Sequence, residues 1–484
     1  MQRAGSKGVR AVARLGLAIG MIAVSGLVTS AAAAGASTST PALGLVWVLP
    51  FVGLLLSIAL FPLLAPSVWH HHDGKIAALC ALAVIVPYGL LLGWPAMTKE
   101  FLHTILLDYI PFIILIGALY TVSGGLFIKG QFSGRPVSNT ALLAFGTVIA
   151  SFVGTTGASM LMIRPLIRAN KHREYAIHVF VFFIFLVSNI GGALTPLGDP
   201  PLFIGFLQGV DFFWTVKAMW PVTLMVTAIL LALFFAIDLG FSLREKRSAS
   251  TAIPAGDRAF GVDGLINLVL LAALIGIVLW SGIAARTSAK VNFFGTDLPL
   301  TGLIRDGALV AVAWLSLLLT PKLAREENGF TFGPMIEVAE LFAGIFITIV
   351  PVLIILKSGK SGALSGLVDL VTLPGGRPND AMYFWLSGTL SSFLDNAPTY
   401  LVFFNLPGVS ANDLMGPLAR TLMAISAGSV FMGANSYIGN APNFMVKAVC
   451  EEQGVRMPSF FGYMLWSVGI LVPIFVLVTF VFFR

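Results

Sequence analysis

The chain has 484 residues, of which 57% are hydrophobic and only 11% are charged, whereas a soluble domain carries about 25% charged residues. Uncharged stretches of about twenty residues recur from end to end, and each could cross a hydrocarbon core as a helix. The composition excludes a soluble globular protein and predicts an all-α polytopic membrane protein. The net charge of +7 does not indicate nucleic-acid binding, because the basic residues lie in loops between apolar stretches.

Residues 1–34 have the composition of a targeting segment. Three basic residues come first, an apolar stretch follows at 15–28, and small residues suited to cleavage end the segment. The segment is therefore either a signal peptide that is removed or an uncleaved first membrane helix. In both cases we expect the following chain to start on the outer face of the membrane.

Ten apolar spans are predicted after this segment. They lie near 43–64, 76–94, 104–128, 175–208, 220–240, 263–282, 303–320, 336–356, 417–450 and 460–482. Threading them from outside puts most basic loops in the cytoplasm, as expected for membrane proteins. These loops contain Lys129 and Arg135, then Arg164 to Arg173, then Arg244 to Arg258, and finally Lys322 and Arg325. We therefore expect a multi-pass protein of the bacterial inner (cytoplasmic) membrane, with the lipid bilayer as its surroundings.

Two further apolar segments, 138–168 and 379–407, are each broken in the middle. The breaks are Gly154-Thr155-Thr156-Gly157 and Asp395-Asn396-Ala397-Pro398. Two apolar half-spans joined by such a break predict a re-entrant hairpin, which enters the membrane and returns to the same side. Non-helical backbone at that depth is tolerated only where protein or a watery cavity satisfies its amide groups.

The chain also matches itself at an offset of 241 residues. Ser151-Phe152-Val153-Gly154-Thr155 corresponds to Ser392-Phe393-Leu394-Asp395-Asn396, and further pairs are Ser188 with Ser429, Gly192 with Gly433, Asp199 with Asn440, and Pro201 with Pro442. Matches among apolar residues are common by chance. Matches of Gly, Pro, Ser and Asp or Asn at the breaks of two segments are not explained by composition, so we predict two repeats.

Each repeat is expected to hold one full span, one re-entrant hairpin and one helix that is interrupted near its middle, at Gly191–Pro201 or at Gly433–Pro442. The predicted topology puts the two hairpins on opposite sides, so the repeats are inverted. The expected divisions are scaffold helices at 35–100, repeat 1 at 101–240, linking helices at 241–335 and repeat 2 at 336–484. Corresponding broken segments in inverted halves indicate a transport site near the bilayer midplane.

The stretches Ser188–Pro201 (SNIGGALTPLGDPP) and Leu394–Thr399 (LDNAPT) resemble the ion transporter superfamily. That group includes citrate-transporter-like proteins, D-type bacterial sodium/proton antiporters and arsenite pumps, and the likeness covers roughly residues 43 to 484. The resemblance implies inverted repeats, a transport domain beside a scaffold, and a homodimer. In one respect the sequence departs from those antiporters, which tend to carry an Asp-Asn pair at both hairpin tips. The first tip here is Gly154-Thr155, so the site would hold one carboxylate fewer.

Asp199 and Asp395 are the acids at the predicted midplane breaks. A carboxylate inside the membrane is costly unless it is solvated, paired or protonated, and it indicates function by default. Such a group can release its proton when a cation arrives and recover it when the cation leaves; the structural alternative is a helix cap. Sodium would also need neutral oxygen ligands. The candidates are Asn189, Asn396 and Asn440, supported by Thr155, Thr156, Thr195, Thr399, Ser429 and Asn435, although each could instead form a cap or a hydrogen bond between helices.

Three functions remain open at this point. The first is a secondary antiporter that exchanges sodium or lithium for protons without a cofactor, and the second is a sodium- or proton-coupled carrier of citrate, another carboxylate or a metal–citrate complex. Family likeness alone adds arsenite export. Because the motifs contain no Lys or Arg to bind a carboxylate, we favour the antiporter. An enzyme is not expected, since the sequence has no nucleophile elbow, phosphate loop or paired-histidine helix. Glu340, about one turn inside its span, and Asp108, at a span end, are outside candidates.

Overall fold

The computed structural model describes residues 43–130, 132–245 and 261–484. The expected targeting segment, 1–34, and the basic residues Lys246, Arg247 and Arg258 lie outside the described residues. The described chain is largely helical, as predicted. Its strands form two small antiparallel sheets, in which β1 (Phe127–Lys129) pairs with β2 (Gly261–Asp263) and β3 (Lys290–Phe293) pairs with β4 (Thr296–Pro299).

Ten helical stretches among the described residues are long and apolar enough to cross a membrane. They are Leu45–Pro62, His71–Leu92, Trp94–Ser123, Pro136–Val153, Ile177–Leu194, Phe212–Arg244, Ile266–Ala284, Leu300–Leu319, Gly333–Lys357 and Phe460–Phe482. All but one of the predicted spans correspond to a member of this set. The exception is 417–450, which is divided into short helices, whereas one arm of the predicted hairpin 138–168 is long enough to qualify. The protein is therefore a multi-pass integral membrane protein.

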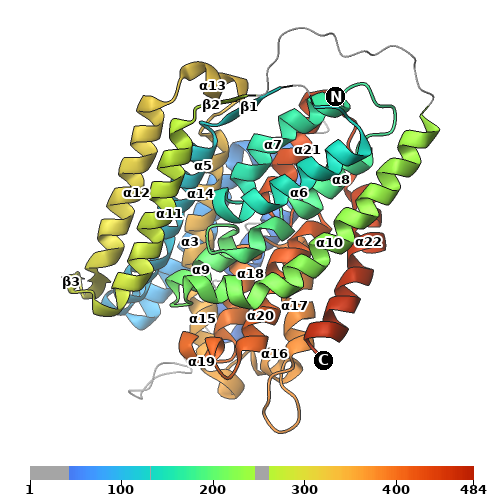
Figure 1. The fold of residues 1–484 in the computed structure, drawn as a ribbon. Helices are drawn as coiled ribbons and strands as arrows, with labels where there is room; N and C mark the ends of the chain where they lie inside the picture. The colour runs from blue at the N-terminus through green and yellow to red at the C-terminus, as the bar shows by residue number, and fades with distance from the viewer. Residues whose placement is uncertain (1–42, 131, 246–260) are drawn as a thin grey trace, which may run out of the picture.

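One group of helices, which we call the flanking helices, packs together at one side of the molecule (Figure 1). The flanking helices are α2 (Leu49–Leu64), α3 (Pro66–Leu92), α4 (Trp94–Thr104), α5 (Ile110–Ser123), α11 (Ile266–Ala284), α12 (Leu300–Leu319), α13 (Lys322–Glu327) and α14 (Gly333–Thr348). Helix α3 packs against α14, and α5 packs against α12. Between α4 and α5 the chain widens into a π turn, η2 (Ile105–Tyr109), just before Pro111, which has no amide hydrogen to donate. Short 3-10 turns lie at η1 (Leu45–Val48) and η4 (Ala285–Thr287).

A second group, the core helices, carries all four predicted breaks. The core helices are α6 (Pro136–Val153), α7 (Thr155–Asn170), α8 (Ile177–Leu186), α9 (Pro200–Leu207), α10 (Phe212–Arg244), α17 (Asp380–Phe393), α18 (Asn396–Asn405), α19 (Ala411–Met415), α20 (Ala419–Phe431), α21 (Ala441–Glu452) and α22 (Phe460–Phe482), with 3-10 turns η3 (Ile190–Leu194) and η6 (Met432–Asn435). The flanking and core groups are joined through α15 (Val350–Lys357), η5 (Gly359–Ser361) and α16 (Ser365–Leu370).

Several basic residues lie at one end of the helix assembly. At the end that holds β1, β2 and α13 (Figure 1), Lys129 pairs with Asp263 at 2.5 Å. Arg168 and Arg325 donate to backbone carbonyls of β1 and α5 at this same end. We call this the basic end; it carries the residues that the sequence assigns to the cytoplasm. The opposite end holds β3, α16 and α19.

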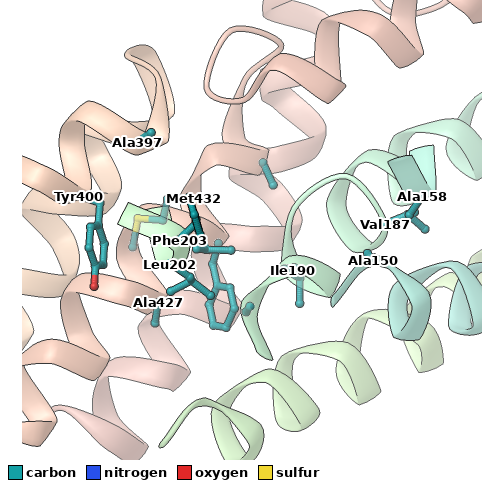
Figure 2. Packing of buried hydrophobic residues seen from close by; sticks show 14 of the residues in the cluster. Ala150, Ala158, Val187, Ile190, Leu202, Phe203, Ala397, Tyr400, Ala427 and Met432 are labelled. Atoms are coloured by element: carbon teal, nitrogen blue, oxygen red, sulfur yellow. The ribbon is translucent and has the colours of Figure 1, made fainter. Parts of the chain in front are cut away.

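Small and large apolar side chains alternate where the core helices meet. Figure 2 shows Ala150 of α6 near Ile190 of η3, and these two elements pack against each other. Tyr400 of α18 is buried, and it packs closely against α9 because Gly205 has no side chain: a Cβ there would overlap the tyrosine hydroxyl. This contact packs α9 closely against α18.

Candidate functional site

The two predicted hairpins are pairs of adjacent helices joined by very short breaks. Helices α6 and α7 are separated only by Gly154, whose φ of 80° lies in the region that favours glycine. Helices α17 and α18 are separated by Leu394 and Asp395. The α6–α7 pair lies toward the basic end, whereas α16, just before α17, lies at the opposite end (Figure 1). Each break therefore lies inside the molecule, at the point where the two helices of its pair meet.

The two long predicted helices are interrupted in corresponding places. In the first, helix α8 gives way to the turn η3, and the helix restarts as α9 at Pro200. In the second, helix α20 gives way to the turn η6, and the helix restarts as α21. The residues just before the restarts, Asp199 and Asn440, both have extended backbone. Proline in the first turn suits such a restart, because its missing amide hydrogen would have no helical acceptor there.

All four breaks meet at the carboxylate of Asp199. Its Oδ1 accepts hydrogen bonds from the Thr155 hydroxyl at 2.7 Å and from the Asn440 side-chain amide at 3.1 Å. Its Oδ2 accepts from the side-chain amide of Asn396 at 2.5 Å. Asp199 is 2% exposed. A single buried carboxylate thus joins the α6–α7 break, the α17–α18 break and both interrupted helices.

Helix ends and hydrogen-bond donors around this carboxylate offset part of the cost of burying its charge. Helices α7, α9, α18 and α21 begin at Thr155, Pro200, Asn396 and Ala441, so four N-termini converge on the site. A helix N-terminus carries partial positive charge and unpaired amide hydrogens. The three side chains that contact Asp199 all act as donors, and donors to a carboxylate stabilise its charge.

A chain of buried amides extends the site. Asn440 also donates to Asn189 Oδ1 at 3.2 Å, and Asn189 donates to Asn443 Oδ1 at 2.7 Å. Asn443 in turn donates to the carbonyls of Gly433 and Ser436. Asn443 was missed by the sequence analysis. The signal that could have found it is its place in the first turn of α21, three residues after Asn440 at the predicted break.

The remaining predicted residues have more local roles. Asp395 caps α18 by accepting from the Ala397 amide at 3.0 Å, and Thr399 donates to the Asp395 carbonyl at 3.0 Å. Within the described residues, Asp395 has no hydrogen bond to the Asp199 cluster; its neighbour Asn396 makes that contact. Outside the site, Glu340 lies exposed on α14, and Asp108 accepts from Gln208 at 2.9 Å.

The same hydrogen bonds recur at the offset of 241 residues. The Ser151 hydroxyl donates to the carbonyl of Gly191, and Thr195 donates to the carbonyl of Ser151. At the matching positions Ser392 donates to Met432, and Ser436 donates to Ser392. The predicted ligand Thr195 therefore ties an interrupted helix to its hairpin, and the equivalent bond in the second half uses a serine.

Three buried oxygens near the breaks have no hydrogen-bond partner among the described residues. They are Asn396 Oδ1, Ser429 Oγ and Asn435 Oδ1. Unpaired buried polar atoms are rare and call for an explanation. A cavity of about 40 Å³ lies beside the first tip, between α5 and the break, and Thr156 and Asp199 line it. Oxygen atoms of this kind are the ligands that a hard cation such as sodium prefers.

A second buried polar cluster, also missed by the sequence analysis, lies toward the basic end. Asp238 of α10 is fully buried and contacts Arg173, His178 and Asn139, and Arg173 also pairs with Glu245 at 3.2 Å. Asp238 is the one acid in the apolar span 212–244, which was the available signal. The cluster ties α10 to the base of the α6–α7 pair, so we interpret it as structural.

Apolar helices long enough to cross a membrane, with helix breaks that enclose a buried polar centre, define a polytopic membrane protein with an internal polar site. Residues 40–483 match the model of a family described as "Putative citrate transport", and the chain belongs to that family. Two relatives named as uncharacterized transporters, from Mycobacterium bovis and Mycobacterium tuberculosis, are each 24% identical over 59% of this chain and 70% of theirs. A 46 kDa membrane protein of Mycobacterium leprae is 22% identical over 66% of this chain and 71% of its own length.

Proposed function

We propose that this protein is a secondary active transporter that exchanges sodium for protons at Asp199. The observation that carries the proposal is the convergence of all four helix breaks on that one carboxylate. Ionised Asp199 would offer its charge to a dehydrated cation, and Asn396 Oδ1 would supply a neutral ligand. When the cation leaves, the carboxylate would take up a proton, because an isolated charge is costly in the membrane interior.

The proposed alternation between the two sides depends on inverted repeats. Two observations support them: the helix pairs reach the site from opposite ends (Figure 1), and the hydrogen bonds of the breaks recur at one offset. In transporters with such repeats, one bundle moves against the other around a central site. By resemblance to the superfamily, we propose that the core helices form the moving transport domain, the flanking helices form a scaffold, and the protein works as a homodimer.

We propose that Asp395 supplies a second negative charge at the tip of the α17–α18 pair. Its cap on α18 requires only an oxygen acceptor, and an asparagine side chain would serve for that. The charge is therefore available for another role, such as attracting the cation to the site or sharing it with Asp199.

A second candidate function, coupled transport of citrate or another carboxylate, is favoured by the family description and by the helix ends. Four helix N-termini converge on the site, and N-termini bind carboxylates and other anions. In this structure they surround the carboxylate of Asp199. A substrate anion would have to displace or neutralise that group, for example by arriving with a bound metal ion. We therefore rank this candidate below cation exchange.

Everted membrane vesicles distinguish the two functions. A pH-sensitive dye reports a preset proton gradient, and added sodium should dissipate it in vesicles that contain the wild-type protein. Asp199→Asn should behave like vesicles without the protein, whereas the matched variant Asp263→Asn, in the β1–β2 ion pair, should exchange normally. If sodium leaves the dye unchanged and labelled citrate accumulates in right-side-out vesicles, the antiport proposal is wrong and the carboxylate carrier is supported.

A further inference from the structure

A cavity of about 510 Å³ lies at the opposite end, away from Asp199. It is bounded by the flanking helices α11 and α12 and by the turn from α9 to α10. Its volume falls in the range of small-molecule pockets, about 300–1,000 Å³. Asp199 lies at the other end of α9, whose eight residues span about 12 Å. The cavity is therefore separate from the proposed exchange site.

The cavity contains the buried guanidinium group of Arg305. Its outer edge, formed by Nη1 and Nη2, has no hydrogen-bond acceptor among the described residues. The Arg305 side chain is 8% exposed, and its Nε donates to Asp306 Oδ1 at 2.7 Å. In the part of the chain that the structure describes, no hydrogen bond reaches its Nη1 or Nη2. Arginine presents two parallel N–H groups on that outer edge, and they match the two oxygens of a carboxylate. Asp306 thus holds the guanidinium group while leaving its bidentate edge unoccupied.

The N-terminus of α12 adds amide donors beside the guanidinium group of Arg305. The first four amide hydrogens of a helix have no helical acceptor. The first two in α12, those of Leu300 and Thr301, are taken by Ala289 and Ser288. The next two belong to Gly302 and Leu303, which line the cavity. A Cβ on Gly302 would lie 4.0 Å from Arg305 Nη2, so the guanidinium group and the helix end face the same space.

The acids around the cavity are already engaged. Asp306 accepts from Arg305, Asp211 caps α10 through the amides of Phe213 and Trp214, and Asp108 accepts from Gln208. His103 also lines the cavity. Each carboxylate has a donor of its own, whereas the outer edge of Arg305 has no acceptor. Although three carboxylates line the cavity against one arginine, each of them has a donor, and within the described residues the outer edge of Arg305 is the place where an added acceptor can bind.

We propose that Arg305 and the first turn of α12 form a binding site for a small oxyanion, such as a carboxylate. The site is independent of sodium/proton exchange at Asp199, so it can be tested whether or not exchange occurs. Because the cavity lies between the flanking helices and the α9–α10 turn, a bound oxyanion would bridge the two helix groups. The oxyanion could come from a soluble carboxylate or from the phosphate group of a lipid, and the experiment separates these sources.

The test measures binding to the purified full-length protein by calorimetry, with citrate, acetate and inorganic phosphate as probes. Arg305→Gln should weaken the tightest of these interactions by about tenfold or more, because the bidentate contact is lost. Asp306→Asn should strengthen it, because the competing carboxylate is neutralised. Lys290→Gln, on exposed β3 at the same end, is the control and should have no effect.

A lipid source gives a different pattern. The soluble probes would not bind, and native mass spectrometry would find a phospholipid that wild-type protein retains and Arg305→Gln loses. If Arg305→Gln fails to fold, Arg305→Lys and Asp306→Asn decide the matter, since lysine keeps the charge but lacks the two parallel donors and should weaken binding. Binding of soluble probes and of lipid that is unchanged in the Arg305 and Asp306 variants would overturn the proposal.

Discussion

Gly192 controls the geometry of the site, because its missing side chain lets the first hairpin tip approach Asp199. A Cβ at this position would lie 2.6 Å from Thr155 Cγ2 and 3.0 Å from Asp199 Cβ. Carbon atoms pack at about 3.5–4.0 Å, so Gly192→Ala must move Thr155 by about 1 Å. The bond from Thr155 to Asp199, now 2.7 Å, would then exceed the length of a hydrogen bond.

The cost of that movement follows from the bond that is lost. A hydrogen bond to a charged group contributes about 1.5–3 kcal/mol, which corresponds to about a 10- to 150-fold change in an equilibrium constant. We therefore predict that Gly192→Ala lowers sodium-dependent proton exchange in vesicles by at least about tenfold while the protein still inserts. The assay is the initial rate of dye recovery at several sodium concentrations, normalised to the amount of protein.

Two other glycines provide matched controls. At Gly433, the corresponding position in the second half, a Cβ would meet its nearest atom, Asn189 Oδ1, at 3.1 Å, so Gly433→Ala should reduce exchange less. At Gly276 in α11, a Cβ would meet nothing within 4 Å, and Gly276→Ala should leave exchange unchanged with a small gain in stability. Wild-type exchange by Gly192→Ala, in a folded protein, would refute the reasoning about the site.

Two further predictions concern the other buried or capping acids. Asp238→Asn removes the fully buried carboxylate that pairs with Arg173 and leaves Arg173 with Glu245 alone. Loss of one partner of a buried ion pair costs about 3–5 kcal/mol, and Glu245 would offset part of this. We expect a lower unfolding temperature in detergent but a normal exchange rate per folded molecule, and unchanged thermal stability would contradict the structural role. Asp395→Asn removes the charge but keeps an oxygen acceptor for the cap on α18. We therefore expect this variant to fold normally and to lose exchange. Normal exchange by the variant would remove Asp395 from the mechanism.

The sequence predicted the features that depend on local chemistry. Hydropathy located the membrane helices, because an apolar stretch of sufficient length is itself the physical requirement for a span. The motif at 188–201 indicated the ion transporter superfamily, consistent with the family match. The segment 417–450 was predicted as one span interrupted at Gly433–Pro442, and the structure interrupts it at Met432–Asn440 but divides it into helices too short to count as one span. Glycine, serine and asparagine in that stretch marked the break without showing that each half is short.

Contacts between distant segments could not be predicted in this way. Asp199 and Asn396 are 197 residues apart, and only packing of the core helices reveals that Asn396, rather than Asp395, contacts the Asp199 carboxylate. The same holds for Asn443, whose partners come from two different breaks. Arg305 lies in a helix outside both predicted hairpins and interrupted helices, and its importance depends on a cavity between helices that a pattern of residues does not encode.

The central claim is that sodium and a proton compete for one carboxylate, and proton release measures this most directly. Purified protein in weakly buffered detergent solution is mixed with sodium chloride while a pH indicator records released protons, with choline chloride as the control salt. We expect saturable release by the wild-type protein and none by Asp199→Asn. Sodium binding without proton release, or equal release by the Asp199→Asn variant, would contradict it.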